Sequence, residues 1–126
     1  MRTSFKNYVI SATFKGDKVW KGNPKNHNNY LVTVRDTETG RSTRFDFWQS
    51  IARPRMESEK DLLFAFYCFI SDAVAGAEGF DEFGRDFGFS EENWETWKAC
   101  KRSTRKVERF TDCDMYDLLN DLSEYA

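Results

Sequence analysis

Few residues of this chain are of the kinds that perform catalysis. Its one histidine, His27, falls in an Asn-rich segment and is expected to face solvent. Because there is no second histidine, Ser-His-Asp triads and multi-histidine metal sites are excluded. The three cysteines, Cys68, Cys100 and Cys113, are widely spaced and include no CxxC pair. Neither a zinc site nor a disulfide framework is therefore indicated, and we expect reduced thiols.

None of the cysteines is expected to be a nucleophile. Cys68 and Cys100 fall on apolar stripes, and Cys113 is flanked by Asp112 and Asp114, which oppose its ionisation. Phosphate-binding glycine motifs are absent. We therefore predict no enzyme and no cofactor, with a carboxylate-and-metal enzyme kept as a minor alternative.

The most specific local pattern is a basic stripe. Lysine and arginine recur at spacings of four, three and four residues, which places them along one side of a helix. The stripe consists of Lys98, Arg102, Arg105 and Arg109, with Lys101 and Lys106 beside it. Such a stripe could follow a phosphate backbone. The alternative is that acidic residues of neighbouring helices pair with it, or that it is only a solvated face.

A second basic surface is expected at the tip of the sheet. Lys18, Trp20 and Lys21 combine positive charge with an aromatic ring. This combination suits single-stranded nucleic acid, which stacks on aromatic rings, and it equally suits a protein interface.

Acidic residues are concentrated in the middle of the chain. Spread over a helical surface, they could imitate a nucleic-acid backbone and occupy a basic groove of a partner protein. Ordinary helix capping and solubility are the alternative. The candidate acidic surface consists of Glu78, Asp81, Glu82, Asp86, Glu91, Glu92 and Glu95.

Charge is segregated along the chain although the net charge is only −2. Residues 1–56 carry eleven basic and four acidic side chains, whereas residues 57–126 carry eight and seventeen. Within the second half, residues 98–109 have a net charge of +5 between two acidic segments. Such blocks concern partners and association, not the fold.

Alternating apolar residues predict three strands, over residues 5–14, 30–34 and 41–48, with a long loop at 15–29. Asp36 to Gly40 has turn chemistry and predicts a hairpin between the last two strands.

Helical periodicity follows the strands. Ser58 and Asp61 predict the capped start of a long helix that stops near Gly76–Gly79. A short helix over 80–88, a helix capped by Ser90 and a last helix capped by Thr111 and Asp114 are expected after it. The order predicts an α+β fold, in which an N-terminal three-stranded antiparallel sheet packs against three to four C-terminal helices.

One domain is expected over residues 1–126, with a β-meander in 1–50 and a helical part in 57–126. The N-terminus has no apolar signal region and no segment is long and apolar enough for a membrane span. We therefore expect a cytoplasmic protein with no membrane partner.

Four ordered blocks of the sequence, Phe45–Ile51, Asp61–Ala73, Gly79–Phe89 and Trp97–Lys101, resemble those of a widespread family of small bacteriophage proteins. Phe45 to Ile51 is similar to the family's "fdFwdSi" strand, and Asp61 to Ala73 to its "DLLxxfxSDA" helix. Gly79 to Phe89 is similar to "sFedFcseFGYd", and Trp97 to Lys101 to "Y/WxACkk". The chain departs from the family's "DSrkAe" run, where it has Glu91 to Glu95.

The resemblance covers about residues 30–110 and implies a phage protein that acts in the bacterial cytoplasm. It carries over no catalytic residues. Small phage proteins of this kind often block host machinery, so we expect an inhibitor of a host defence complex, plausibly an anti-CRISPR protein that occludes a CRISPR effector. The alternative is an accessory protein that binds nucleic acid directly through the basic stripe and the Trp20 segment.

Overall fold

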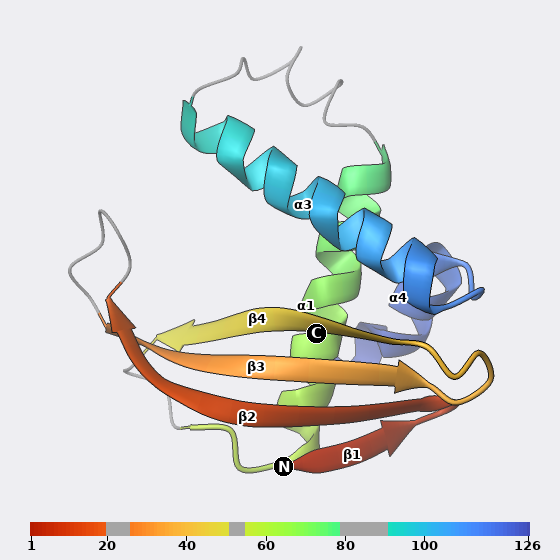
Figure 1. Cartoon of the computed structure of the whole chain (residues 1–126), viewed down its shortest axis with the longest axis horizontal. Coiled ribbons are helices and arrows are strands. Elements are labelled where there is room, and N and C mark those ends of the chain that lie inside the picture. The colour runs from red at the N-terminus through yellow and green to blue at the C-terminus, as the bar shows by residue number, and fades with distance from the viewer. Residues whose placement is uncertain (20–25, 51–54, 79–90) are drawn as a thin grey trace. The chain divides into compact units, whose positions relative to one another are not determined.

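The computed structural model describes residues 1–19, 26–50, 55–78 and 91–126. The contacts divide the chain into two compact units, residues 1–66 and 67–126, and each is described by itself. In chain order the elements are β1 (Arg2–Phe5), β2 (Tyr8–Val19), β3 (Asn26–Asp36), β4 (Ser42–Ser50), α1 (Glu59–Glu78), α3 (Glu91–Phe110), α4 (Met115–Leu122) and the 3₁₀ turn η1 (Ser123–Tyr125) (Figure 1). The predicted α+β class is confirmed. The short helix predicted over 80–88 and the Ser90 cap lie outside the described residues.

The first unit contains an antiparallel sheet in the order β1-β2-β3-β4 (Figure 1). It has four strands where the sequence predicted three, because β1 lies mostly before the predicted first strand, which is interrupted at Lys6 and Asn7. Phe5 pairs with Tyr8 across this two-residue loop, and Lys6 has a φ of 51°. Hairpin loops of this length usually place Gly or Asn at a residue with positive φ, so a lysine there gives no turn signal.

The predicted loop over 15–29 is also wrong for most of its length. Strand β2 continues to Val19 and β3 begins at Asn26. A register shift between Phe14 and Gly16, where Gly16 has a φ of 96°, marks a bulge that lets the pairing continue. Glycine adopts this positive φ at no steric cost, and backbone pairing does not require apolar side chains.

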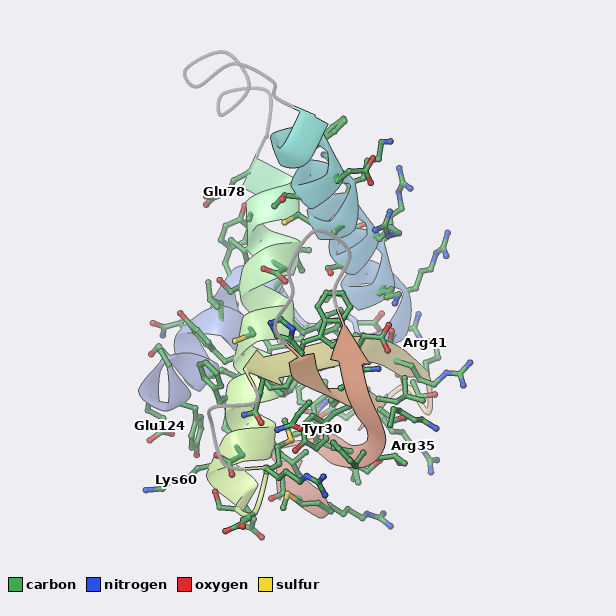
Figure 2. The ribbon with its side chains drawn as sticks, turned by 90° about the vertical axis from the view of Figure 1, so that its left-hand side faces the viewer. Tyr30, Arg35, Arg41, Lys60, Glu78 and Glu124 are labelled. Atoms are coloured by element: carbon green, nitrogen blue, oxygen red, sulfur yellow. The ribbon has the colours of Figure 1, made fainter. Side chains whose placement is uncertain are left out.

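One face of the sheet is buried in alternation, as the period-2 pattern predicted. Ile10, Val32 and Val34 are fully buried, and Tyr8 stacks edge-on against Phe66 of α1 at a centroid distance of 5.4 Å. Tyr30 lies on the same face, where its hydroxyl accepts a hydrogen bond from the backbone N–H of Met56 at 2.9 Å (Figure 2). The first two turns of α1 therefore cover this face within the first unit.

The hairpin predicted between β3 and β4 is confirmed and is closed by Asp36. The Asp36 carboxylate, 1% exposed, accepts hydrogen bonds from the Asn7 amide at 2.7 Å and from the Glu38 backbone at 2.9 Å. Gly40, with a φ of 75°, donates its N–H to the Asp36 carbonyl. Because Asn7 belongs to the first hairpin, Asp36 ties the two turns at this end of the sheet together.

The second unit contains the rest of α1 together with α3, α4 and η1. Helix α4 is capped by Asp114, whose side chain accepts from the backbone of Tyr116 and Asp117. The predicted cap at Thr111 is wrong, since its hydroxyl instead accepts from the Cys113 N–H at 3.2 Å. The fully buried side chains of this unit are Ile70, Ala73, Val107, Phe110, Leu118 and Leu122.

Candidate nucleic-acid interface

Helix α3 presents two faces of opposite character. Cys100, Thr104 and Val107 recur at spacings of four and three and are buried. The cations lie about half a turn away from this line, as the 3.6-residue period requires. The predicted basic stripe is therefore an exposed face of α3, on which Lys98, Arg102, Arg105 and Arg109 are all exposed.

Two residues hold α3 close to α1 within the second unit. The Thr104 hydroxyl lies 2.7 Å from the carbonyl of Ala73 on α1 and 3.0 Å from the carbonyl of Cys100, and donates its single proton between them. Opposite lies Gly76 of α1, where an added Cβ would fall 2.5 Å from the Cys100 carbonyl oxygen and also against the Thr104 hydroxyl. Glycine is thus required for this approach, which fixes α3 with its cations facing away from α1.

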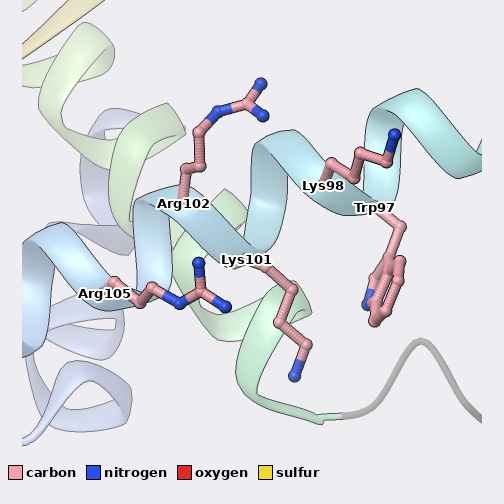
Figure 3. Close-up of a pocket in the computed structure, with 5 residues that line it drawn as sticks. All are labelled: Trp97, Lys98, Lys101, Arg102 and Arg105. Atoms are coloured by element: carbon pink, nitrogen blue, oxygen red, sulfur yellow. The ribbon is translucent and has the colours of Figure 1, made fainter.

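A groove of about 420 Å³ lies along α3. We call it the α3 groove; it is lined by Trp97, Lys98, Lys101, Arg102 and Arg105 (Figure 3). Trp97 and Lys101 leave the helix on the same side, and the Lys101 ammonium lies 5.9 Å from the centroid of the indole (Figure 3). One aromatic ring and four cations therefore line the same groove, which suits an anionic ligand with an apolar part.

The cations of the groove differ in their ion pairs within the described part of the chain. The Lys98 ammonium is 3.3 Å from the Glu95 carboxylate, but both side chains are exposed, and exposed pairs contribute only about 0–1 kcal/mol. Arg102 and Arg105 form no ion pair with any described residue. The alternative that acidic neighbours pair with the stripe is therefore not realised at these two arginines.

The candidate acidic surface is not assembled among the described residues. Glu78 ends α1 and is exposed, as Figure 2 shows, and Glu95 is exposed on α3. The other members are Asp81, Glu82 and Asp86, which lie outside the described residues, and Glu91 and Glu92, whose backbone begins α3.

The second basic surface is described only in part. Lys18 lies in β2, in register with His27 of β3, while Trp20 and Lys21 lie outside the described residues. His27 was expected to face solvent from a loop, and this is wrong. It is a half-buried strand residue, and its Nδ1 is buried without a hydrogen-bond partner among the described residues.

The thiols that are enclosed are poorly suited to nucleophilic chemistry. Burial raises the pKa of Cys68 and of Cys100, and the nearby Asp72 carboxylate adds to the effect in both. Cys113 is exposed and its thiol lies 3.5 Å from the Asp114 carbonyl oxygen. No group of three or more His, Cys, Asp or Glu side chains placed to hold a metal occurs in the described part of the chain.

The predicted basic stripe did not include Trp97, and the place of this residue in the groove was missed. The residue is half-buried, so part of the ring packs inward and part lines the α3 groove. The available signal was the four-residue spacing from Trp97 to Lys101, which puts a cation beside an aromatic ring on a helix.

Nothing matched this chain in comparisons with protein-family models, with curated proteins or with solved structures. None of the helices in the described residues is long and apolar enough to cross a membrane.

Proposed function

We propose that this protein is a binding protein without catalytic activity, and that its α3 groove holds the phosphate backbone of a nucleic acid. The observation that carries the proposal is the pair Arg102 and Arg105, exposed side by side and without an ion pair among the described residues. Lys98 and Lys101 complete a basic surface on one helix.

The spacing of the cations suits a linear polyanion. A helix rises about 1.5 Å per residue, so Lys98 and Arg105 are separated by roughly 10 Å along the axis. Cations at this spacing can pair with two or three successive phosphates and release their condensed counterions. The chain's net charge of −2 does not oppose this, because the 98–109 segment alone has a charge of +5.

The experiment is a binding titration with a fluorescent mixed-sequence oligonucleotide at 50 mM and 200 mM salt. Binding is expected at low salt and should be lost in the variant Arg102→Glu/Arg105→Glu. The matched control is Arg2→Glu/Arg35→Glu, which makes the same change of net charge at exposed positions of the sheet. No binding by the natural chain at 50 mM salt, or equal losses in both variants, would refute a site on α3.

Inhibition of a host defence complex is a second proposal, supported by the resemblance to phage proteins and by the segregated charge. The exposed Glu78 and Glu95 are the described members of the surface that it would use. It predicts that affinity purification from a bacterial host recovers an effector subunit and that phage plating on CRISPR-active cells rises. Recovery of no such subunit together with unchanged plating would rule it out.

A further inference from the structure

We infer that the nucleic acid of the α3 groove is single-stranded, and that one base stacks on the Trp97 indole while adjacent phosphates pair with Arg102 and Arg105. This inference rests on the proposed function, since it names the class of nucleic acid that the same site takes.

Trp97 lies on the flank of α3, between the buried line and the exposed cations, and only part of its ring is covered. Lys101 lies beside the ring at 5.9 Å and points in the same direction (Figure 3). The indole is thus partly buried and partly exposed in the groove, with the Lys101 ammonium near the ring.

A partly exposed indole can stack on the face of a nucleic-acid base. In a duplex the faces of the bases are stacked on one another and are closed to side chains, whereas a single strand offers them. Stacking on an aromatic side chain beside a basic surface is the common mode of single-strand binding, and it tolerates any base. Aromatic stacking has no comparable use against the outside of a duplex, where contacts to phosphates and base edges dominate.

The volume of the α3 groove matches a small ligand. The groove volume of about 420 Å³ falls in the range of small-ligand pockets, roughly 300–1,000 Å³. That is room for one unstacked nucleotide. The neighbouring phosphates would then pair with Arg102 and Lys98, which also line the groove but extend away from Trp97 (Figure 3).

The cations of the groove would contact different phosphates. Lys101 lies next to the indole and can contact the phosphate of the stacked nucleotide, whereas Arg102 and Arg105 are free of ion pairs among the described residues and can engage its neighbours. Arginine binds phosphate through two parallel N–H groups, which adds geometric specificity to the charge attraction.

The test uses the unmodified 126-residue chain and three probes of equal length: a single strand, the same strand with abasic nucleotides, and its duplex. The abasic strand keeps every phosphate and removes every base. We expect it to bind roughly ten-fold to hundred-fold more weakly than the intact strand, because the stacking is lost. The duplex should also bind more weakly than the intact strand.

Protein variants provide the second arm. Trp97→Ala should weaken binding of the intact strand by a similar factor and leave binding of the abasic strand unchanged, while Trp97→Phe should retain most of the affinity. Trp48→Ala is the matched control, since Trp48 is 37% exposed and lies on β4 of the sheet. If the Trp97→Ala variant does not fold, the comparison of the intact and abasic strands with the unmodified chain still tests whether a base stacks.

Three results would overturn the inference. Equal affinity for the intact and abasic strands would exclude stacking, and tighter binding of the duplex would exclude a single-stranded ligand. Tighter binding of a polyglutamate peptide of equal charge would assign the groove to an acidic protein. The first two leave the proposed function standing, whereas no binding of any nucleic acid would remove both.

Discussion

At the start of α1, one carboxylate oxygen of Asp61 accepts backbone hydrogen bonds from Glu57 at 3.0 Å and Ser58 at 3.1 Å. The Ser58 hydroxyl accepts in return from the Asp61 N–H at 3.4 Å. This reciprocal arrangement was predictable, because capping depends on residues that are neighbours in the sequence. The conformation of Lys6, by contrast, could not be predicted. Its positive φ depends on the pairing of β1 with β2, and lysine is not a residue type that indicates a positive φ.

The cap predicts a pH-dependent contribution to stability. The hydrogen bond from the Glu57 backbone is the main cause that lowers the pKa of Asp61 below its usual value. A lowered folded-state pKa means that the stabilisation is complete above the unfolded value, near 3.9, and is lost as the pH falls through the folded value. Asp61→Ala should therefore lower the free energy of unfolding by about 1 kcal/mol at pH 7, and the difference should disappear towards pH 2.

Urea unfolding at a series of pH values measures this difference. The control is Glu59→Ala, which removes an exposed acid of the same first turn, with a smaller loss expected. A difference for Asp61→Ala that stays constant down to pH 2 would contradict the cap.

At the scale of elements, the helices were predicted better than the strands. The end of α1 was predicted near Gly76–Gly79, and the helix ends at Glu78. The outer halves of β2 and β3 are rich in Gly, Asn and Lys, so composition favoured a loop. Their pairing, from Gly16 with Asn29 to Val19 with Asn26, is made by backbone groups that composition does not report.

The close contact between α1 and α3 decides whether Gly76→Ala raises or lowers the stability of the protein. Gly76→Ala would stabilise an isolated helix by about 1 kcal/mol, since alanine has the higher helix propensity. Here the added methyl would meet the Cys100 carbonyl and the Thr104 hydroxyl, and overpacking typically costs about 1–3 kcal/mol. We therefore expect a net loss of stability.

Thermal and urea unfolding measure the effect of Gly76→Ala. The control is Ala75→Ser at the preceding, exposed position, which should change stability by no more than about 0.5 kcal/mol. A stabilised Gly76→Ala protein would show that α1 and α3 do not approach closely in solution.

At the scale of the whole molecule, the segregation of charge was predictable from the sequence, but the groove that these charges line was not. The basic stripe follows from residue type and helical period alone, so its exposure on α3 agrees with the prediction. The α3 groove depends on how Trp97 packs, and its four-residue spacing from Lys101 indicates only that the two side chains are neighbours. The resemblance to phage proteins and the single-domain organisation stay predictions, and most of the candidate acidic surface lies outside the described residues.

The central claim is that cations of α3 pair with phosphates, and the salt dependence of binding tests it most directly. For a single strand, the slope of log K against log salt is about −0.7 for each phosphate neutralised. Arg102→Gln/Arg105→Gln should therefore make the slope less steep by about 1.4 and weaken binding equally for all sequences. An unchanged slope in this variant, with the natural chain still bound, would contradict the account.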